Sequence, residues 1–464
     1  MITESIIYFF LALQLLYLFF LLLSNLSTTL FIVISLRRVI DYFFSSTDVL
    51  AHKIINSNNY RPVSILVPAY NEEKTIITSV HSFLRLHFPE YEVIVINDGS
   101  TDTTMALLIA EFELFANARP IKMQIAHEEI RGVYLSARYP NLIVVDKENG
   151  GKADALNCGI NISRFPLFCS VDADTMLEHD AIIKSIITFS EDRRVIAVGG
   201  KIGIMNGCEV KNSKVIAKRV PKTAIEAFQV IEYTRGFLAG RTAWDQMGAL
   251  LIISGAFGVF RKDIVLNING YRHTIGEDFD LLIRMHRYSY DKKIAHEVRF
   301  IPDTMCWTQA PNDYTSLLKQ RNRWHRGLLE TLYYNKGMIF NPRYKKVGLL
   351  ALPYFLVIEA FSPIISILGI VSIVVFYLYG LLNRDAIMIF FLLEFMWGAL
   401  LNIGSLSLEL FVKHRFKSLK EIYILLILSF LEPFIYRPLL KVESFLATFN
   451  FLNTSWGEIK RKSI

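Results

Sequence analysis

The stretch Val63-Ser-Ile-Leu-Val-Pro-Ala-Tyr-Asn-Glu72 begins the part of the chain in which the sequence pattern decides the fold. Its first five residues are mostly apolar, enough for one short strand, and polar residues follow at once. Similar apolar runs recur at 92–96, 142–145, 167–171, 195–198 and 250–253, with helical stretches between them. Strands this apolar, alternating with helices, are typical of a mostly parallel sheet that is covered on both faces. The pattern therefore predicts an α/β domain.

Polar clusters follow the first, second and fourth of these runs, where the predicted strands end. The clusters are Pro68-Ala-Tyr-Asn-Glu72, Asn97-Asp-Gly-Ser-Thr-Asp102 and Asp172-Ala-Asp174. Parallel α/β sheets bind their ligands at the carboxyl ends of the strands, so these clusters are candidates for one shared site. Each cluster taken singly also has a structural reading, because Asp and Asn are common in turns. Their recurrence at three strand ends favours a binding function.

Asp172 and Asp174 are candidate metal ligands. The two residues alternate about Ala173, so both carboxylates can converge on a hard divalent cation that keeps open positions for phosphate oxygens. The spacing therefore predicts Mg²⁺ or Mn²⁺ bridging a diphosphate.

Two further motifs are suited to phosphate binding and proton transfer. Asn149-Gly-Gly-Lys152 places glycines and an ammonium before a predicted helix, where they can meet a phosphate; a Gly-rich connector with a solvated lysine is the alternative. Gly276-Glu-Asp278 opens an amphipathic run, so its carboxylates can simply favour the positive end of a helix. A carboxylate there can also act as a general base, and the motif alone leaves open whether Glu277 or Asp278 does so.

The segment Gln320-Arg-Asn-Arg-Trp-His-Arg-Gly327 precedes a series of membrane-length apolar segments. In a helix, Gln320, Arg323 and Trp324 share one face, because they lie at i, i+3 and i+4. An arginine there can clamp a diphosphate, and a tryptophan offers a flat platform for a sugar ring. Amphipathic surface helices also produce such triplets by chance. His325 and Arg326 fall on another face and are expected to be solvated or packing residues.

The composition divides the chain between two solvents. Of its 464 residues, 52% are hydrophobic, and the excess is concentrated in residues 6–36 and 347–450. The net charge of +7 includes basic clusters beside the apolar segments, such as Arg37-Arg38, as in cytoplasmic loops of membrane proteins. The sequence contains no basic stripe with interleaved aromatic residues, so no nucleic-acid partner is expected. Four cysteines without a Cys-x-x-Cys pair are expected to be reduced packing residues: Cys158, Cys169, Cys208 and Cys306.

The apolar segments predict a membrane protein. Residues 6–36 hold no charge over a length that exceeds the hydrocarbon core of a bilayer, which predicts one spanning anchor with its N-terminus outside. Later segments predict an interfacial helix at 349–360 and spans at 362–382 and 386–412. Charges interrupt the last segment, 421–450, and ionisable residues in a membrane indicate function by default. That segment is therefore expected to be re-entrant or bent, with a single crossing as the alternative.

These patterns divide the chain into an anchor at 1–38, a cytosolic α/β domain at 61–335, a membrane region at 348–450 and a basic tail at 451–464. The expected fold class is α/β with a mixed, mostly parallel sheet and transmembrane helices before and after it. The expected location is the plasma or inner membrane, crossed several times.

Taken in order, the motifs resemble those of the processive membrane β-glycosyltransferases of family 2, such as cellulose, hyaluronan, chitin and poly-N-acetylglucosamine synthases. The matching motifs are Tyr70-Asn-Glu72, Asn97-Asp-Gly99, Asp172-x-Asp174, Gly276-Glu-Asp278 and Gln320-x-x-Arg-Trp324. The resemblance covers essentially the whole chain. It implies a glycosyltransferase A-type fold and a metal-dependent, inverting transfer from a UDP-sugar to a polysaccharide or glycolipid acceptor. It is also compatible with accessory export proteins as partners.

The resemblance assigns roles residue by residue. For the donor, it implies uracil-side contacts for Tyr70 and Glu72, a nucleotide contact for Asp98, a nucleotide or ribose contact for Asp172 and a diphosphate contact for Lys152. It implies that Asp174 is the main metal ligand and that Asp278 is the general base. It implies diphosphate and acceptor contacts for Gln320, Arg323 and Trp324. Between the two adjacent carboxylates it therefore decides for Asp278.

The chain also departs from the family pattern. Asn97 stands where cellulose synthases usually have Asp, Gly276 stands where many have Thr, and no cyclic-dinucleotide domain follows the membrane segments. These departures favour an aminosugar polymer, with UDP-N-acetylglucosamine as donor. The leading hypothesis is a processive synthase that exports its chain. The alternatives are a non-processive transferase acting on a lipid-linked acceptor and a transporter or scaffold without catalysis, which the intact acidic positions disfavour.

Overall fold

The computed structural model describes residues 2–44, 60–117, 120–380, 384–412 and 418–451. The chain forms two compact units, each discontinuous in sequence. The sheet unit contains Ile40–Arg219 and Met247–Ala310, and the helical unit contains Met1–Val39, Val220–Gln246 and Pro311–Ile459. The helical unit therefore includes residues 220–246 and 311–335 of the predicted 61–335 domain, whose boundaries stay a prediction.

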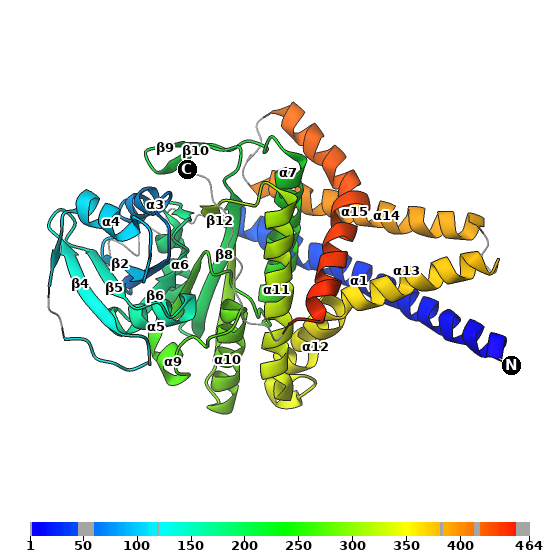
Figure 1. Cartoon of the computed structure of the whole chain (residues 1–464), viewed down its shortest axis with the longest axis horizontal. Coiled ribbons are helices and arrows are strands. Elements are labelled where there is room, and N and C mark those ends of the chain that lie inside the picture. The colour runs from blue at the N-terminus through cyan, green and yellow to red at the C-terminus, as the bar shows by residue number, and fades with distance from the viewer. Residues whose placement is uncertain (1, 45–59, 118–119, 381–383, 413–417, 452–464) are drawn as a thin grey trace. The chain divides into compact units, whose positions relative to one another are not determined.

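One mixed sheet of ten strands forms the centre of the sheet unit (Figure 1). Its strands are β1 (Val63–Ala69), β2 (Tyr91–Asp98), β3 (Leu114–Ala116), β4 (Ile130–Ser136), β5 (Leu142–Lys147), β6 (Leu167–Ser170), β7 (Met176–Leu177), β8 (Val195–Ile204), β11 (Gly258–Arg261) and β12 (Glu297–Thr308). Their order across the sheet is β3-β4-β5-β2-β1-β6-β11-β8-β12-β7. Neighbouring strands from β5 to β6 are parallel, whereas β11 runs antiparallel to both β6 and β8. The predicted α/β sheet is thus confirmed, with its parallel strands at the centre.

The register of the central strands brings their carboxyl ends to one edge. Ala69 pairs with Asn97, and Asn97 pairs with Asp146 on the next strand. Leu66 pairs with Ser170 on the other side of β1. Parallel strands in such a register end side by side, so the polar residues that follow them gather at the same edge of the sheet.

Helices alternate with these strands. They are α3 (Ile76–Phe83), α4 (Thr104–Phe112), α5 (Lys152–Ile162), α6 (Ala181–Glu191), α9 (Lys262–Asn267) and α10 (Glu277–Asp291), and a separate hairpin consists of β9 (Glu209–Lys211) and β10 (Lys214–Ala217). Helix α5 is buried along almost its whole length. It approaches the sheet closely at Gly159, where an added Cβ would lie 3.0 Å from Ile96 and 3.2 Å from Leu66.

The strand expected at 250–253 is not formed, and this prediction was wrong. Residues 250–253 are mostly buried but stand outside the sheet, and the strand of this region is β11. The side chain of Ile253 instead lies over Gly199 and Gly258, two glycines that pair across β8 and β11. An added Cβ would lie 2.8 Å from Ile253 at Gly199 and 2.6 Å at Gly258. The apolar run therefore packs on a face of the sheet, which a strand pattern alone does not distinguish from a place within it.

The helical unit consists of long helices joined by short helical turns. Its regular helices are α1 (Ile2–Phe44, up to Val39 in this unit), α7 (Ala224–Thr234), α8 (Thr242–Gln246), α11 (Tyr314–Tyr334), α12 (Leu352–Tyr354), α13 (Ser362–Leu378), α14 (Arg384–Val412) and α15 (Leu419–Thr448). Stretches of π-helix occupy Arg235–Arg241, Val347–Ala351 and Phe355–Ala360, and 3₁₀ turns occupy Lys336–Met338 and Pro342–Tyr344. Helix α13 packs closely against α1, because an added Cβ at Gly369 would lie 2.3 Å from the ring of Tyr17.

Membrane-length helices occur at both ends of the chain. Within the described residues, Ile7–Phe44 and Leu419–Thr448 are long and apolar enough to cross a bilayer. Val347–Ala360 and Ser362–Leu378 form a pair bent by 42°, as expected for an interfacial helix that leads into a span. Helix α14 occupies the second predicted span. The predicted membrane protein is confirmed, whereas the number of crossings stays a prediction.

The last apolar segment forms one continuous helix, and whether this helix re-enters or crosses the membrane stays a prediction. Helix α15 contains Pro433 and Pro438 and changes direction along its length (Figure 1). Its buried Glu432 lies 2.7 Å from Arg437, accepts a hydrogen bond of 2.9 Å from Asn402 and pairs with Arg235 at 3.4 Å. Because these partners satisfy the carboxylate, the helix can continue through a position where an unpaired charge would be costly.

Candidate active site

A lysine stands among the acidic residues of the sheet edge. The ammonium of Lys152, the first residue of α5, lies 2.7 Å from Asp172 and 3.3 Å from Glu277. Burial lowers the pKa of Lys152, but the negative charges of Asp172 and Glu277 raise it by more. The pKa of Lys152 is therefore above its usual value. The side chain therefore stays protonated at neutral pH. A small hollow beside it is lined by Lys152, Ser254, Gly255, Tyr271, Glu277 and Asp278.

The adjacent carboxylates Glu277 and Asp278 have different surroundings at the start of α10. Glu277 is buried, with 6% of its surface exposed, and faces Lys152. Asp278 is partly exposed and accepts hydrogen bonds from the backbone N–H groups of Gly255, at 3.0 Å, and Phe279, at 2.8 Å. An added Cβ at Gly255 would lie 2.6 Å from the ammonium of Lys152, so a larger residue there would displace this ammonium. The geometry thus leaves Asp278 more open to a substrate than Glu277.

Asp98, at the end of β2, is almost fully buried, and its carboxylate has several protein partners. It accepts hydrogen bonds from the backbone N–H of Gly150, at 3.0 Å, and of Gly151, at 2.7 Å. It also lies 2.7 Å from the ammonium of Lys147. Asp98 therefore holds the glycine turn that precedes Lys152.

Tyr70 and Glu72 follow β1 at the same edge. Half of Tyr70 is exposed, whereas Glu72 is buried and accepts a hydrogen bond of 2.8 Å from the hydroxyl of Thr75. The backbone N–H of Glu72 donates to Thr104 at 2.9 Å, which ties the segment after β1 to the start of α4. Tyr70 is thus the more accessible of the two predicted uracil-side residues.

The residues after β6 fit a divalent cation that is coordinated by both protein carboxylates and phosphate oxygens. Asp172 is about one-third exposed at its side chain, and Asp174 is mostly buried two residues later in the same turn. Mg²⁺ is usually held in proteins by one or two carboxylates together with substrate phosphates and water. This pair of carboxylates at a strand end has that donor set, so it needs no third protein ligand.

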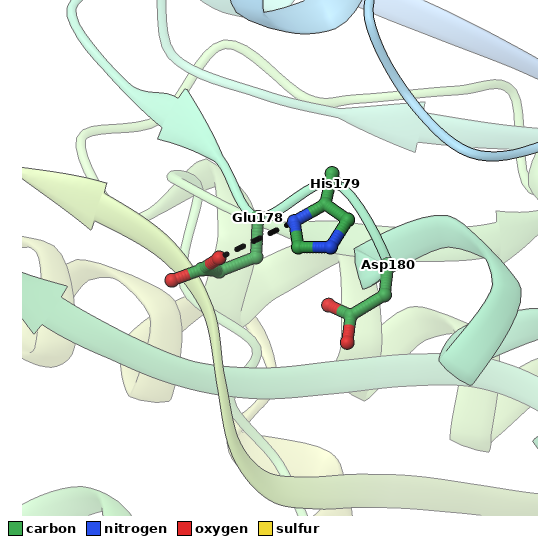
Figure 2. A group of neighbouring side chains, drawn as sticks. All are labelled: Glu178, His179 and Asp180. Carbon is green, nitrogen blue, oxygen red and sulfur yellow. Dashed lines mark ion pairs between the residues drawn. The ribbon is translucent and has the colours of Figure 1, made fainter. Parts of the chain in front are cut away.

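A second acidic group lies in the connection between β7 and α6. A carboxylate oxygen of Glu178 lies 3.9 Å from Nδ1 of His179. Figure 2 shows these two side chains with Asp180 beside them. Their ligand atoms lie close enough together for a metal ion, but both carboxylates bind protein partners. Glu178 accepts a 2.7 Å hydrogen bond from Trp307, and Asp180 pairs with Lys184 at 2.7 Å. We therefore assign this group a structural role.

The residues of the Gln320–Gly327 motif lie on α11 in the helical unit, apart in sequence from the acidic residues of the sheet unit. Trp324 is 45% exposed, and Gln320 and Arg323 are partly buried. The structure describes the two units separately, so the assignment of these three residues to diphosphate and acceptor stays a prediction. His325 and Arg326 are buried, so they are packing rather than solvated residues.

The sequence analysis did not identify Arg321, which supports Trp324. Its guanidinium lies 4.1 Å from the centre of the Trp324 ring, a distance typical of a cation–π contact. Arg321 also pairs with Glu232 on α7 at 2.8 Å and donates to Tyr436 on α15 at 3.3 Å. The i, i+3 spacing of Arg321 and Trp324 was visible in the sequence, whereas the partners on α7 and α15 were not.

Comparison with known proteins defines the class. Residues 64–265 match the family model "Glycosyl transferase family 2", and residues 167–431 match the model "Glycosyl transferase family group 2". The second match covers more than half of the chain, which therefore belongs to the family 2 glycosyltransferases. The resemblance inferred from the motifs is thereby confirmed, and so is the assignment as an enzyme.

Among its relatives, the chain is similar to poly-beta-1,6-N-acetyl-D-glucosamine synthases of Staphylococcus epidermidis. It is 29% identical to one of them over 378 residues, which cover 79% of this chain and 78% of that protein. It is 28% identical to another, from strain RP62A, over 404 residues that cover 84% of each. A solved structure of mannosyltransferase PcManGT from Pyrobaculum calidifontis, in complex with GDP-Man and Mn²⁺, aligns with 89% of this chain and 97% of its own at a TM-score of 0.53. The identity to PcManGT is 15%, so this likeness supports the glycosyltransferase A-type fold alone.

Proposed function

We propose that this protein transfers N-acetylglucosamine from UDP-N-acetylglucosamine to a growing polysaccharide at the cytosolic face of a membrane. The observation that carries the proposal is the gathering of carboxylates around Lys152 at the carboxyl edge of the sheet, where Asp172 lies 2.7 Å from the ammonium and Asp278 lines the same small hollow as Lys152. Family membership and the two similar poly-beta-1,6-N-acetyl-D-glucosamine synthases support the type of reaction, the donor and the polymer.

The proposed reaction is a single displacement at the anomeric carbon of the donor. An acceptor hydroxyl attacks this carbon while Asp278 takes the hydroxyl proton, and the bond to the diphosphate breaks so that UDP leaves with both electrons. Attack from the face opposite UDP inverts the configuration of the sugar. Asp278 is suited to the role of base because its carboxylate is partly exposed and oriented by two backbone N–H groups.

The other predicted residues would bind and orient the donor and acceptor. Lys152 would neutralise charge on the diphosphate, since its ammonium lies at the edge where the phosphates are expected. Asp174 would be the main ligand of Mg²⁺ or Mn²⁺, which when bound supplies further neutralisation of the leaving group. Asp172 would contact the nucleotide or its ribose. Contacts to the uracil, the nucleotide, the diphosphate and the acceptor are proposed for Tyr70, Glu72, Asp98, Gln320, Arg323 and Trp324.

The proposal is tested by supplying the purified protein in lipid nanodiscs with a panel of UDP-sugars and Mg²⁺ or Mn²⁺. We expect UDP release and polymer formation with UDP-N-acetylglucosamine, and loss of both on chelation of the metal. A different preferred UDP-sugar would overturn the donor assignment. A product with one added sugar on a lipid would show instead the non-processive alternative.

The topology yields a separate prediction. A reporter at the N-terminus should be external and one inserted beside Asn117 cytosolic, because Arg37-Arg38 follow the first span and the donor is made in the cytosol. Labelling of intact cells with an impermeant reagent measures both positions, and permeabilised cells give the control in which both react. Labelling of the Asn117 reporter in intact cells would contradict the proposed site, since the donor could not reach it.

The proposed platform role of Trp324 predicts an effect on product length. We expect Trp324→Ala to leave UDP affinity within about twofold of wild type but to shorten or abolish the polymer, because stacking on an aromatic ring stabilises a bound sugar. Product sizing and UDP-binding calorimetry measure the two effects separately. Tyr314→Ala is the matched control, as Tyr314 is an equally exposed aromatic residue of the same helix. Equal product lengths for both variants would refute the role.

A further inference from the structure

Lys147, the last residue of β5, is a lysine without any exposed side-chain surface. Its ammonium lies between two carboxylates, 2.7 Å from Asp98 and 2.6 Å from Asp154, and it also donates to the backbone carbonyl of Glu148. Removing a charge from water is costly, and a buried ion pair seldom stabilises a fold more than apolar residues of the same size would. The presence of this group therefore calls for a role other than stability.

The first partner of Lys147, Asp98, binds the glycine turn at 149–151. The carboxylate of Asp98 accepts hydrogen bonds from the backbone N–H groups of Gly150 and Gly151. Its backbone carbonyl accepts a 2.7 Å hydrogen bond from the side chain of Asn149. Gly151 has a φ of +85°, which other residues rarely adopt. The turn is thus held in an unusual conformation by the residue that Lys147 neutralises.

The second partner of Lys147, Asp154, lies in the first turn of α5. Asp154 is buried, two residues after Lys152, and accepts hydrogen bonds of 3.1 and 3.2 Å from the backbone N–H of Glu128. The turn approaches Asp154 so closely that an added Cβ at Gly150 would lie 2.5 Å from its carboxyl carbon. Lys147 therefore connects the segment before Lys152 with the segment after it.

We propose that Lys147 is a positioning residue of the donor site, which acts with Asp98 and Asp154 to place Lys152 and the start of α5 against the diphosphate. The inference rests on the proposed function. Lys147 itself touches neither donor nor acceptor, because its side chain is enclosed by protein. Its role is specific to phosphate, since the groups that it places are an ammonium and a helix start.

The test uses a variant that preserves the charge of the group. Removing Lys147 alone would leave two buried carboxylates without a counter-ion, which is expected to destabilise the protein strongly. Lys147→Met/Asp154→Asn removes one charge of each sign, so the net charge of the group is unchanged. We expect this variant to melt closer to wild type than Lys147→Met does, to bind UDP with Mg²⁺ at least about tenfold more weakly, and to bind uridine, which lacks phosphates, as wild type does.

A double-mutant cycle separates positioning from general destabilisation. If Lys147 acts through Lys152, Lys147→Met/Asp154→Asn should reduce the affinity for UDP much less in a Lys152→Met background than in wild type. Lys184→Met is the matched control, since Lys184 also lies between two aspartates of the sheet unit, Asp180 and Asp303, each at 2.7 Å. It should lower the melting temperature without changing the affinity for UDP.

The outcomes are distinct. Unchanged UDP affinity in Lys147→Met/Asp154→Asn, equal losses for UDP and uridine, or additive losses with Lys152→Met would each overturn the positioning role while leaving the transferase intact. Failure of the wild-type protein to bind UDP with either metal would overturn the proposed function, and this role with it, because there would be no donor to position.

Discussion

Asp278→Asn should bind UDP-N-acetylglucosamine as wild type does and turn it over at least about a hundredfold more slowly. General-base assistance contributes roughly 10²–10⁴ in rate, and an amide cannot accept the proton of the acceptor hydroxyl. Folding should survive, because the amide keeps one of the two oxygens that accept from Gly255 and Phe279, and only one of these hydrogen bonds is lost. The expected loss of stability is on the order of 1 kcal/mol, that of one lost hydrogen bond.

Binding and turnover must be measured separately for this variant, by calorimetry and by initial rates of UDP release. Asp263→Asn is a suitable control, because Asp263 is an exposed acid at the start of α9 that pairs only with Arg261 among the contacts described. Glu277→Gln should behave differently from both, by weakening donor binding, since Glu277 faces Lys152. Near wild-type polymerisation by Asp278→Asn would place the base elsewhere, with Glu277 as the next candidate.

Asp174→Ala should abolish transfer and weaken metal-dependent binding of UDP by about a hundredfold or more. Loss of residues that merely orient a metal ligand already costs 10–100-fold in affinity or activity, so removal of a ligand should cost at least as much. The diphosphate would lose the cation that connects it to the protein. Calorimetric titration of UDP with Mg²⁺, Mn²⁺ or EDTA measures the effect, and in EDTA the variant and wild type should bind equally weakly.

Asp180→Ala is the informative control for Asp174. Asp180 belongs to the acidic group with Glu178 and His179, which has the spacing of a metal site but binds protein partners. Its removal should leave metal-dependent UDP binding unchanged. If Asp180→Ala abolished that binding and Asp174→Ala did not, the metal would belong to the connection between β7 and α6, and the assigned site would be wrong.

The sheet and the membrane segments follow largely from local patterns. The runs that form β1, β2, β5, β6 and β8 are apolar enough to be recognised as buried strands, and the charge-free residues 6–36 lie within helix α1. Polar clusters after β1, β2 and β6 could be placed at one edge in advance, because parallel strands end on the same side. Five motifs in a fixed order were enough to indicate the family, which the comparisons confirmed.

Only the tertiary structure decided which side chains meet. Lys147 reads in the sequence as one lysine among many, and its burial between Asp98 and Asp154 depends on residues that are 49 and 7 positions away. Arg321 likewise gains Glu232 and Tyr436 from two other helices. Residues 250–253 have the pattern of a strand, yet Gly199 and Gly258 provide the space in which Ile253 packs on the sheet. The sequence alone determined most element types and indicated candidate reacting residues, because periodicity and residue chemistry are local. Long-range pairing determined how these residues are held, because burial and counter-ions are supplied by distant parts of the chain.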